Sequence, residues 1–348
     1  MNVHNSAVER LCRRNVPLAK FSTYGIGGNA NYLAMPETSE ELAELLQDCK
    51  RRGMPWFIFG MGSNILFPDE PGRDTVFITL KNMAEIKANE DRWYVSAGTP
   101  MSLLSLLGLV GGTDMLDFTF LLPGCLGAGI YMNAKYNAQQ ICDIVDVVYY
   151  IDTEDPSLQV RSISAEDCRF AYKQSIFQQH PWIVLGADLK LCVSSEEQVR
   201  TAAVLLAEWK ARGSHPSSLP SFFSFFLGEI HSLAGRGIQT PQTMLDIIRY
   251  RTGKKHFDYP SCGSVFKNNY DYGVATGFLV DKLNLKGTEH GGAIISPHHG
   301  NMILNYNQAT AADVIYLINL ITEAVHKEFG FVPEPEIVLV EEKDKNSL

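Results

Sequence analysis

A short glycine-rich segment is the first feature of the sequence whose residue types could do chemistry. Residues 57–67 read FIFGMGSNILF, so an apolar run is broken between Gly60 and Asn64 before a second apolar run follows. Glycines let a backbone turn tightly, and the amides of such a turn can converge on an anion such as a pyrophosphate. The segment lacks the third glycine and the following helix of the dinucleotide fingerprint, and an ordinary hairpin loop is the alternative interpretation.

Basic side chains gather in a second region of the chain. Arg249, Arg251, Lys254 and Lys255 form the densest basic cluster, and they directly precede the sequence YPSCGSVFKN at residues 259–268. Basic clusters are more often solvated surface, but the neighbouring Gly–Ser turn favours an anion-binding site here.

Composition and charge exclude several classes of protein. The 348 residues carry a formal net charge of -9, which argues against general nucleic-acid binding. Seven scattered cysteines without a C-x-x-C pair indicate free thiols in a reducing compartment. The adjacent His298 and His299 would point to opposite faces of a strand, so no metal site is predicted. Without a secretion signal or a bilayer-length apolar stretch, we expect a cytoplasmic protein with no membrane contact.

The elements that must position these residues follow from apolar periodicity and capping signals. The length predicts two or three domains. Thr38 and two glutamates predict a helix that ends before Gly53, inside a β-α-β unit. Further helices are expected over 103–108, 195–212, 241–249, 278–283 and 311–329, and strands over 57–59, 76–80, 93–97, 145–151, 182–191, 293–296, 301–305 and 333–340. We expect a loop-rich insertion over 213–240, in which the run SFFSFF at 221–226 is core rather than a lid or a subunit contact, and a loose tail over 341–348.

Seven stretches, taken in order, resemble one family, UDP-N-acetylenolpyruvoylglucosamine reductase (MurB). They are FSTYGIGGNA, GMGSNILF, LPGCLGAGIYMNA, FAYKQSIF, YPSCGSVFKN, LKG followed by GGAIIS, and PEPEI, and they span roughly residues 20 to 340. Each motif alone is weak, whereas seven in order make the resemblance specific. The resemblance implies an α+β, three-domain flavoenzyme of the vanillyl-alcohol-oxidase/MurB type.

The same resemblance implies the domains and the reaction. We expect FAD-binding subdomain 1 over residues 19–82, FAD-binding subdomain 2 over 83–255 (with the insertion at 213–240, and completed by 330–342), and a substrate-binding domain over 256–329. NADPH would reduce FAD that is bound without a covalent link. The flavin would then reduce UDP-N-acetylglucosamine enolpyruvate to UDP-N-acetylmuramate, in peptidoglycan precursor synthesis. The oligomeric state is open, with a monomer favoured.

Roles carry over residue by residue as implications of the resemblance. Ser264 would give a proton to carbon, and Glu336 would act as the acid on the substrate carboxylate together with Lys173. The implied substrate contacts are Tyr172, Arg251, Lys254, Asn268, Lys286 and His299. The implied FAD contacts are Tyr24, Gly60, Met61, Gly62, Ser63, Asn64, Pro123, Gly124, Gly127, Ala128, Gly129 and Asn133. For the small residues at 124–129, close packing without a ligand is an equal alternative.

The sequence departs from the family pattern at several points. Lys173 stands where the family has arginine and lacks its planar fork. One lost charge-assisted bond, worth ~1.5–3 kcal/mol, would slow the reduction roughly ten- to hundredfold. Residues 135–137 replace a glycine-rich tail, Asn269 replaces a proline, and the insertion is longer than expected. These departures count against full activity, but an active reductase is still favoured over a diverged flavin-binding relative that is catalytically weak or acts on another nucleotide-sugar.

Overall fold

The first lobe is built on a four-stranded sheet. The computed structural model describes residues 6–89, 92–190, 195–212 and 218–340. The sheet has the order β1 (Cys12–Arg13), β4 (Tyr32–Ala34), β7 (Val76–Thr79) and β5 (Trp56–Phe59), and β4, β7 and β5 run parallel. Smaller elements of this lobe are α1 (Ala7–Leu11), β2 (Val16–Pro17), η2 (Leu18–Phe21), β3 (Asn29–Ala30), β6 (Ile65–Leu66) and η3 (Leu80–Asn82).

Helix α2 (Ser39–Arg52) makes the crossover in this sheet, and its predicted bounds are confirmed. The Thr38 side chain accepts a hydrogen bond from the amide of Glu41 at the N-terminus of the helix. Gly53 ends the helix with φ of 65°, a conformation that glycine adopts without steric cost. Buried leucines on one face hold α2 against the sheet.

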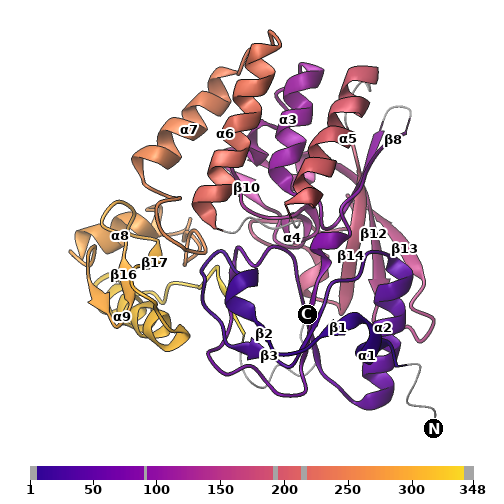
Figure 1. Cartoon of the computed structure of the whole chain (residues 1–348). Coiled ribbons are helices and arrows are strands. Elements are labelled where there is room, and N and C mark those ends of the chain that lie inside the picture. Colours follow the sequence, from indigo (N-terminus) through magenta and orange to yellow (C-terminus); the bar gives the residue numbers. More distant parts are fainter. Residues whose placement is uncertain (1–5, 90–91, 191–194, 213–217, 341–348) are drawn as a thin grey trace.

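The second lobe contains a five-stranded antiparallel sheet covered by helices. Its strand order is β13 (Val160–Ser164), β12 (Val145–Asp152), β14 (Trp182–Leu189), β9 (Arg92–Ser96) and β8 (Ile86–Asn89). The helices are α3 (Met101–Gly111), α4 (Leu126–Tyr131), α5 (Glu196–Ala211), α6 (Leu219–Gly235) and α7 (Gln242–Gly253). Helices α3, α5, α6 and α7 lie together above the sheet in the view of Figure 1. Short elements are η4 (Asp117–Thr119), β10 (Lys135–Tyr136), β11 (Gln139–Gln140), η5 (Ile141–Asp143) and η6 (Ile176–Gln178).

The prediction of a loop-rich insertion over 213–240 is wrong for most of that range, because α6 occupies residues 219–235. Ser218 caps this helix, and Phe222, Phe225 and Phe226 are buried in one core cluster with Trp209. Three phenylalanines within two turns place enough apolar area on one face to fix the helix against its neighbours. The interpretation of the aromatic run as core is confirmed. Residues 213–217 lie outside the described residues.

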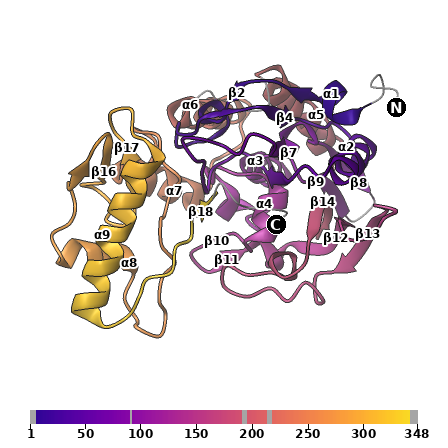
Figure 2. The ribbon, with the colours of Figure 1, turned by 90° about the horizontal axis from the view of Figure 1, so that it is seen from below.

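The third lobe is smaller and stands to one side of the other two (Figure 2). Helix α9 (Ala311–Phe329) matches its prediction and ends at Gly330 with φ of 79°. The remaining elements are α8 (Thr276–Lys282) and a sheet of β15 (Glu289–His290), β16 (Ala293–Ile295) and β17 (Ile303–Asn305). The predicted domain boundaries stay predictions, and the core of this lobe also takes in Tyr24, Ile26 and Leu66 of the first lobe.

The chain returns from the third lobe to the first through a short strand. Strand β18 (Val338–Leu339) pairs in parallel with β6. The strand predicted over 333–340 is thus reduced to two residues, because Pro333 and Pro335 have no amide hydrogen to donate to a ladder. The predicted loose tail at 341–348 lies outside the described residues.

We expect Phe226→Ala to destabilise the second lobe by about 3–5 kcal/mol, the usual result of removing a fully buried phenylalanine. Phe226 is 0% exposed. Ser224→Ala on the exposed face of the same helix serves as the control and should change the free energy of unfolding by less than about 0.5 kcal/mol. Urea unfolding measures both variants, and similar values for the two would contradict a core role for the aromatic run.

Candidate functional site

The glycine-rich loop from Gly60 to Asn64 joins two strands that belong to different sheets. Strand β5 pairs with β7, and β6 pairs with β18, so the loop is not a hairpin. The Thr79 hydroxyl donates to the Gly60 carbonyl at 2.7 Å. At the other end, the Asn64 side-chain amide donates to the Glu336 carbonyl at 2.8 Å. The loop is therefore held between the first sheet and the returning C-terminal segment.

Close packing explains why glycine is required in this loop. A Cβ on Gly62 would lie 2.1 Å from the Phe21 carbonyl oxygen, and one on Gly60 would lie 2.2 Å from the Cys125 sulfur. Similar contacts occur in the opposite segment, where a Cβ on Gly127 would lie 2.7 Å from Ala97 Cβ, and one on Gly129 would lie 2.6 Å from Met101 Sδ. The approach of Gly60 to Cys125 brings the first and second lobes into contact, whereas the other three approaches tighten packing within one lobe.

A cavity of about 440 Å³ opens next to the loop, and residues from all three lobes line it. It shares Ser63, Asn64, Ala128 and Met132 with a smaller apolar pocket of about 130 Å³. The two pockets therefore adjoin and are treated as one cleft, whose apolar part suits the flat ring system of a cofactor. The predicted FAD contacts that line it are Gly60, Met61, Gly62, Ser63, Asn64, Pro123, Gly124, Gly127, Ala128 and Gly129.

Two predicted FAD contacts, Tyr24 and Asn133, do not line this cleft and have other partners. The Tyr24 side chain is fully buried in the core of the third lobe, where its hydroxyl donates to the Ile303 carbonyl at 2.9 Å. The side-chain amide of Asn133 donates to the Ala171 carbonyl at 3.0 Å. Asn133 therefore supports the loop that carries Lys173, and Tyr24 joins two lobes.

Lys173, Glu336 and Ser264 line the same cavity, although they lie far apart in the sequence. Lys173 and Glu336 form a largely buried ion pair, with side chains 15% and 14% exposed. Lys173 has φ of 56°, a left-handed conformation that is costly for a residue with a side chain. Reciprocal backbone hydrogen bonds between Ala171 and Gln174 hold this turn at 3.1 and 3.2 Å.

Backbone pairing places Ser264 next to Glu336. The amide of Glu336 donates to the Val265 carbonyl at 2.7 Å. The amide of Val265 in turn donates to the Asn301 carbonyl at 2.9 Å. Gly263, with φ of 72°, turns the chain just before Ser264. The backbones of Ser264 and Glu336 thus lie next to each other in the lining of the cavity.

The lining of the cavity also contains buried polar atoms that have no hydrogen-bond partner within the described part of the chain. They are Arg251 Nε, His256 Nε2, Ser261 Oγ and His299 Nδ1. A buried polar group that lacks a partner costs about 1–3 kcal/mol, so such atoms favour a ligand that supplies partners.

Burial sets the charge of these groups. Desolvation lowers the pKa of Arg251 to about 10, which leaves the guanidinium protonated at neutral pH. Desolvation, with a contribution from Arg251, lowers the pKa of His256 to about 3. Burial also lowers the pKa of His299, so both imidazoles are neutral. Of the charged residues that line the cavity, Lys135, Lys173 and Arg251 are cations and Glu336 is the anion, which suits an anionic ligand.

The remaining predicted substrate contacts divide into two groups. Tyr172 and Asn268 line the cavity, and the backbone N–H of Asn268 donates to the Tyr172 hydroxyl at 3.2 Å. Lys254 and Lys286 do not line it. Lys254 is exposed, and Lys286 pairs with Asp281 at 2.6 Å. Both lysines nevertheless act electrostatically on His299.

His256 is a cavity residue that the sequence did not reveal. The signal available was its position directly after the basic cluster, and histidine in a polar loop is not distinctive. The departures from the family pattern also find structural roles. Tyr136 lies under the Arg251 guanidinium at 5.5 Å, and the Asn269 side chain accepts from the amides of Asp271 and Tyr272. Asn269 thus forms the turn in place of a proline.

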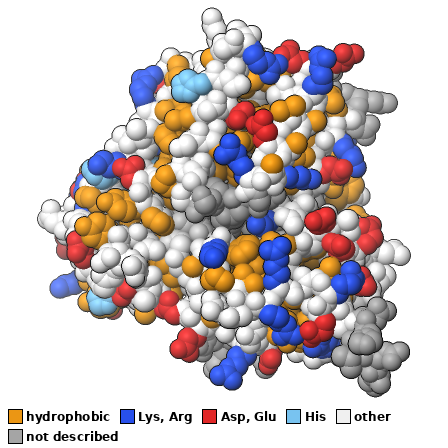
Figure 3. All heavy atoms as spheres, in the orientation of Figure 1, with side chains coloured by type: hydrophobic (Ala, Val, Ile, Leu, Met, Phe, Trp, Pro, Cys, Tyr) orange, Lys and Arg blue, Asp and Glu red, His pale blue; other side chains and the backbone are white. Residues whose placement is uncertain are grey.

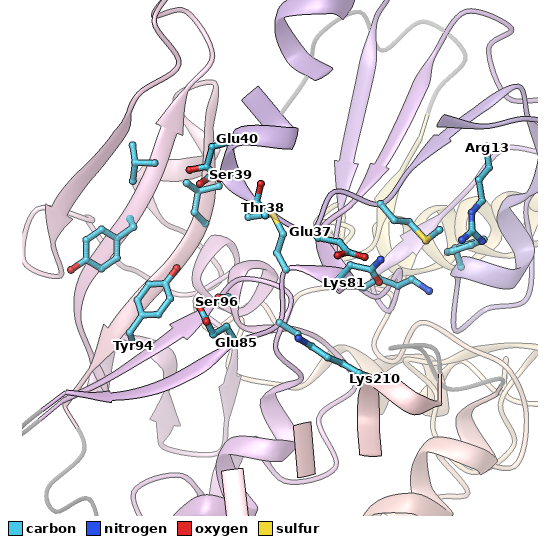
Figure 4. Close-up of a pocket in the computed structure, with 18 residues that line it drawn as sticks. Arg13, Glu37, Thr38, Ser39, Glu40, Lys81, Glu85, Tyr94, Ser96 and Lys210 are labelled. Carbon is cyan, nitrogen blue, oxygen red and sulfur yellow. The ribbon is translucent and has the colours of Figure 1, made fainter. Parts of the chain in front are cut away.

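A larger cavity of about 850 Å³ lies elsewhere, between the start of α2 and the second sheet (Figure 4). It contains none of the predicted site residues. Charged side chains of both signs line it, namely Arg13, Lys81, Lys210, Glu37, Glu40 and Glu85. This mixture does not select one class of ligand, so size alone does not make it the functional site.

On the face shown in Figure 3, the described Lys and Arg side chains are interspersed with Asp and Glu. Within the described ranges, no helix is both long enough and apolar enough to cross a bilayer. The same residues contain no group of three or more His, Cys, Asp or Glu side chains arranged to hold a metal ion.

Comparison with known proteins first defines the class of protein. Residues 30–158 match a family model described as "FAD binding domain". Residues 255–340 match "UDP-N-acetylenolpyruvoylglucosamine reductase, C-terminal domain". The chain is thus a flavoprotein with an α+β fold and a third, family-specific lobe, as the resemblance implied.

Relatives along the whole chain then define the family. The UDP-N-acetylenolpyruvoylglucosamine reductase of Treponema denticola is 30% identical, over 92% of this chain and 91% of that protein. The one from Caldanaerobacter subterraneus is 29% identical over 94% and 93%. The crystal structure of MurB from Thermus caldophilus superposes with a TM-score of 0.67 at 26% identity, over 95% of this chain and 99% of that one. The chain belongs to the UDP-N-acetylenolpyruvoylglucosamine reductase family.

We expect Gly62→Ala to lower the amount of FAD that the purified protein retains, because the new methyl group would collide with the Phe21 carbonyl and displace the loop. Gly53→Ala is the matched control: its φ of 65° resembles the 61° of Gly62, but its Cβ would meet nothing within 4 Å. The ratio of flavin to protein absorbance measures both variants. Equal retention of FAD by the two would show that the close approach does not shape the flavin site.

Proposed function

We propose that this protein reduces the enolpyruvyl group of UDP-N-acetylglucosamine enolpyruvate to give UDP-N-acetylmuramate, in the synthesis of peptidoglycan precursors. NADPH is the proposed electron donor, and FAD is proposed to bind without a covalent link. The observation that carries the proposal is the meeting of the Lys173–Glu336 pair and Ser264 in one cavity beside the glycine-rich loop. Whole-length similarity to reductases of this name supports it.

The proposed roles of the side chains follow from where charge develops. FAD, once bound and reduced by NADPH, would supply the hydride for the enolpyruvyl double bond. Negative charge then builds up beside the substrate carboxylate, where a fixed cation stabilises it best. Lys173, oriented by Glu336, is the proposed source of that cation. The Ser264 hydroxyl is the proposed donor of the proton to carbon.

Lysine at position 173 retains part of what arginine would do. An ammonium group has three hydrogen-bond donors, and the Glu336 carboxylate takes one of them. The other donors remain for a substrate carboxylate, but they do not form the parallel pair of bonds that a guanidinium makes. The structure therefore favours a working but slowed reductase over a protein without this activity.

The anionic parts of a nucleotide-sugar are proposed to bind near Arg251. Arg251 Nε, His256 Nε2 and His299 Nδ1 have no hydrogen-bond partner within the described residues, and we propose that these three side chains contact the substrate. Tyr172 and Asn268, which also line the cavity, are proposed to contact it as well. Lys254 and Lys286 are proposed to act from the rim, since they lie within electrostatic reach of His299.

The proposed setting of the reaction is the cytoplasm, with the protein as a monomer. The described cysteines 12, 49, 125, 142, 168 and 262 are free thiols, and such thiols are typical of a reducing compartment.

The decisive experiment mixes anaerobically reduced protein with UDP-N-acetylglucosamine enolpyruvate. The proposed function requires the absorbance of oxidised flavin to return as the sugar is reduced. UDP-N-acetylglucosamine, which has no enolpyruvyl group, is the control and should leave the flavin reduced. A flavin that stays reduced with both sugars would contradict the assignment.

We expect Ser264→Ala to leave the reduction of bound flavin by NADPH nearly intact while stopping its reoxidation by the enolpyruvyl sugar, because only the second half-reaction needs a proton at carbon. Stopped-flow absorbance separates the two half-reactions. Ser162→Ala, at an exposed position in β13, is the control and should change neither rate. Equal damage to both half-reactions in Ser264→Ala would contradict the proposed role.

We expect Lys173→Arg to speed the reoxidation of flavin by the enolpyruvyl sugar by roughly tenfold or more, because the guanidinium adds a second bond to the carboxylate. The conservative replacement Lys282→Arg on the exposed face of α8 should have no such effect. Single-turnover reoxidation measures this step directly. An unchanged rate in Lys173→Arg would point instead to a different substrate for this protein.

A further inference from the structure

We propose that Thr23 is a positioning residue, which fixes the separation between the glycine-rich loop and the segment that carries Ser264. The proposal rests on the proposed function, because it concerns how the proton donor is held against the flavin site. Thr23 itself belongs to the first lobe and precedes Tyr24, which enters the core of the third lobe. It is therefore placed where two lobes meet.

The contacts of Thr23 reach both segments. Its amide donates to the Gly62 carbonyl at 3.1 Å, which ties it to the loop. Its hydroxyl donates to the Ser261 carbonyl at 2.8 Å. In return, the Ser261 amide donates to the Thr23 carbonyl at 3.1 Å. Thr23 is thus bonded to the glycine-rich loop on one side and to residues 261–265, the serine segment, on the other.

The serine segment is short, so the position of Ser261 constrains the position of Ser264. Ser261 precedes Ser264 by three residues, and the intervening Cys262 thiol donates to the Ile65 carbonyl at 3.1 Å, just beyond the loop. The far side of the segment is fixed by the pairing of Val265 with Glu336. Ser264 is therefore held from two sides, by the hydrogen bonds between Thr23 and Ser261 and by the bond between Val265 and Glu336.

The hydroxyl of Thr23 matters because this contact is buried. Thr23 is 5% exposed, so water does not readily replace its bond to the Ser261 carbonyl. Removing the hydroxyl leaves that carbonyl without this donor and allows the segment to shift. A displacement of about 1 Å at a reacting centre can slow a reaction about a hundredfold. A small movement of the serine segment would thus slow proton delivery while the flavin site stays intact.

The test compares Thr23→Val, which has the same shape without the hydroxyl, with Thr23→Ser, which retains the hydroxyl. We expect Thr23→Val to retain FAD and its reduction by NADPH, but to slow flavin reoxidation by the enolpyruvyl sugar about tenfold or more. Thr23→Ser should restore most of the rate. Thr153→Val is the matched control, since Thr153 is also buried and its hydroxyl donates to the Pro181 carbonyl at 2.9 Å, and it should leave both half-reactions unchanged.

Several outcomes would overturn the proposal. Loss of FAD from Thr23→Val would assign the residue to the flavin site. Equal slowing of both half-reactions would contradict the positioning role, and so would unchanged rates in both. Amide hydrogen exchange gives a readout that does not depend on the reaction: residues 261–265 should exchange faster in Thr23→Val than in Thr153→Val, and equal exchange would also overturn it. If the wild-type flavin is not reoxidised by the enolpyruvyl sugar, the proposed function fails, while the exchange measurement still decides the role of Thr23.

Discussion

The close approach of Gly62 to the Phe21 carbonyl is the constraint on which the rest of the structure depends. A Cβ on Gly62 would lie 2.1 Å from that oxygen, which leaves no space for it. The glycine-rich loop therefore lies directly on the segment that leads to Thr23. The same loop bonds to Thr79 through Gly60 and to the Glu336 carbonyl through Asn64. Each lobe contacts this loop or the residues next to it. The position of the loop backbone therefore constrains the positions of the other segments of the site.

Backbone hydrogen bonds hold the segments that carry the three proposed catalytic groups. Lys173 comes from the second lobe, Ser264 leads into the third lobe, and Glu336 lies on the return to the first. The pairing of β6 with β18 and of Val265 with Glu336 brings the Ser264 and Glu336 segments together, whereas the backbone bonds between Ala171 and Gln174 hold the turn that carries Lys173. Backbone pairing fixes register to a single residue, which long flexible side chains alone cannot do. The ion pair between Lys173 and Glu336 is then made between groups whose main chains are already in place.

Features with a local cause were predictable from the sequence. The caps of α2 and α9 lie in neighbouring residues, and both helices occur as expected. Helix α6 was missed because serines and a proline around SFFSFF resemble a loop, whereas burial against Trp209 decides the outcome. The motif containing Tyr24 did not show that its side chain enters another lobe. Likewise, nothing local distinguishes His256, whose position depends on the packing of Arg251 and His299 around one cavity.

Lys173 and Arg251 line the same cavity, but their positive charges are balanced differently. Glu336 is the carboxylate that lines the cavity, and it pairs with Lys173. We propose that Lys173 therefore attracts a resting anion weakly and gains most when new negative charge develops nearby. The burial of Arg251 makes the unliganded state costly, and an anionic ligand would relieve that cost on binding. In this proposal Arg251 contributes affinity for the nucleotide-sugar, whereas Lys173 contributes stabilisation of the transition state.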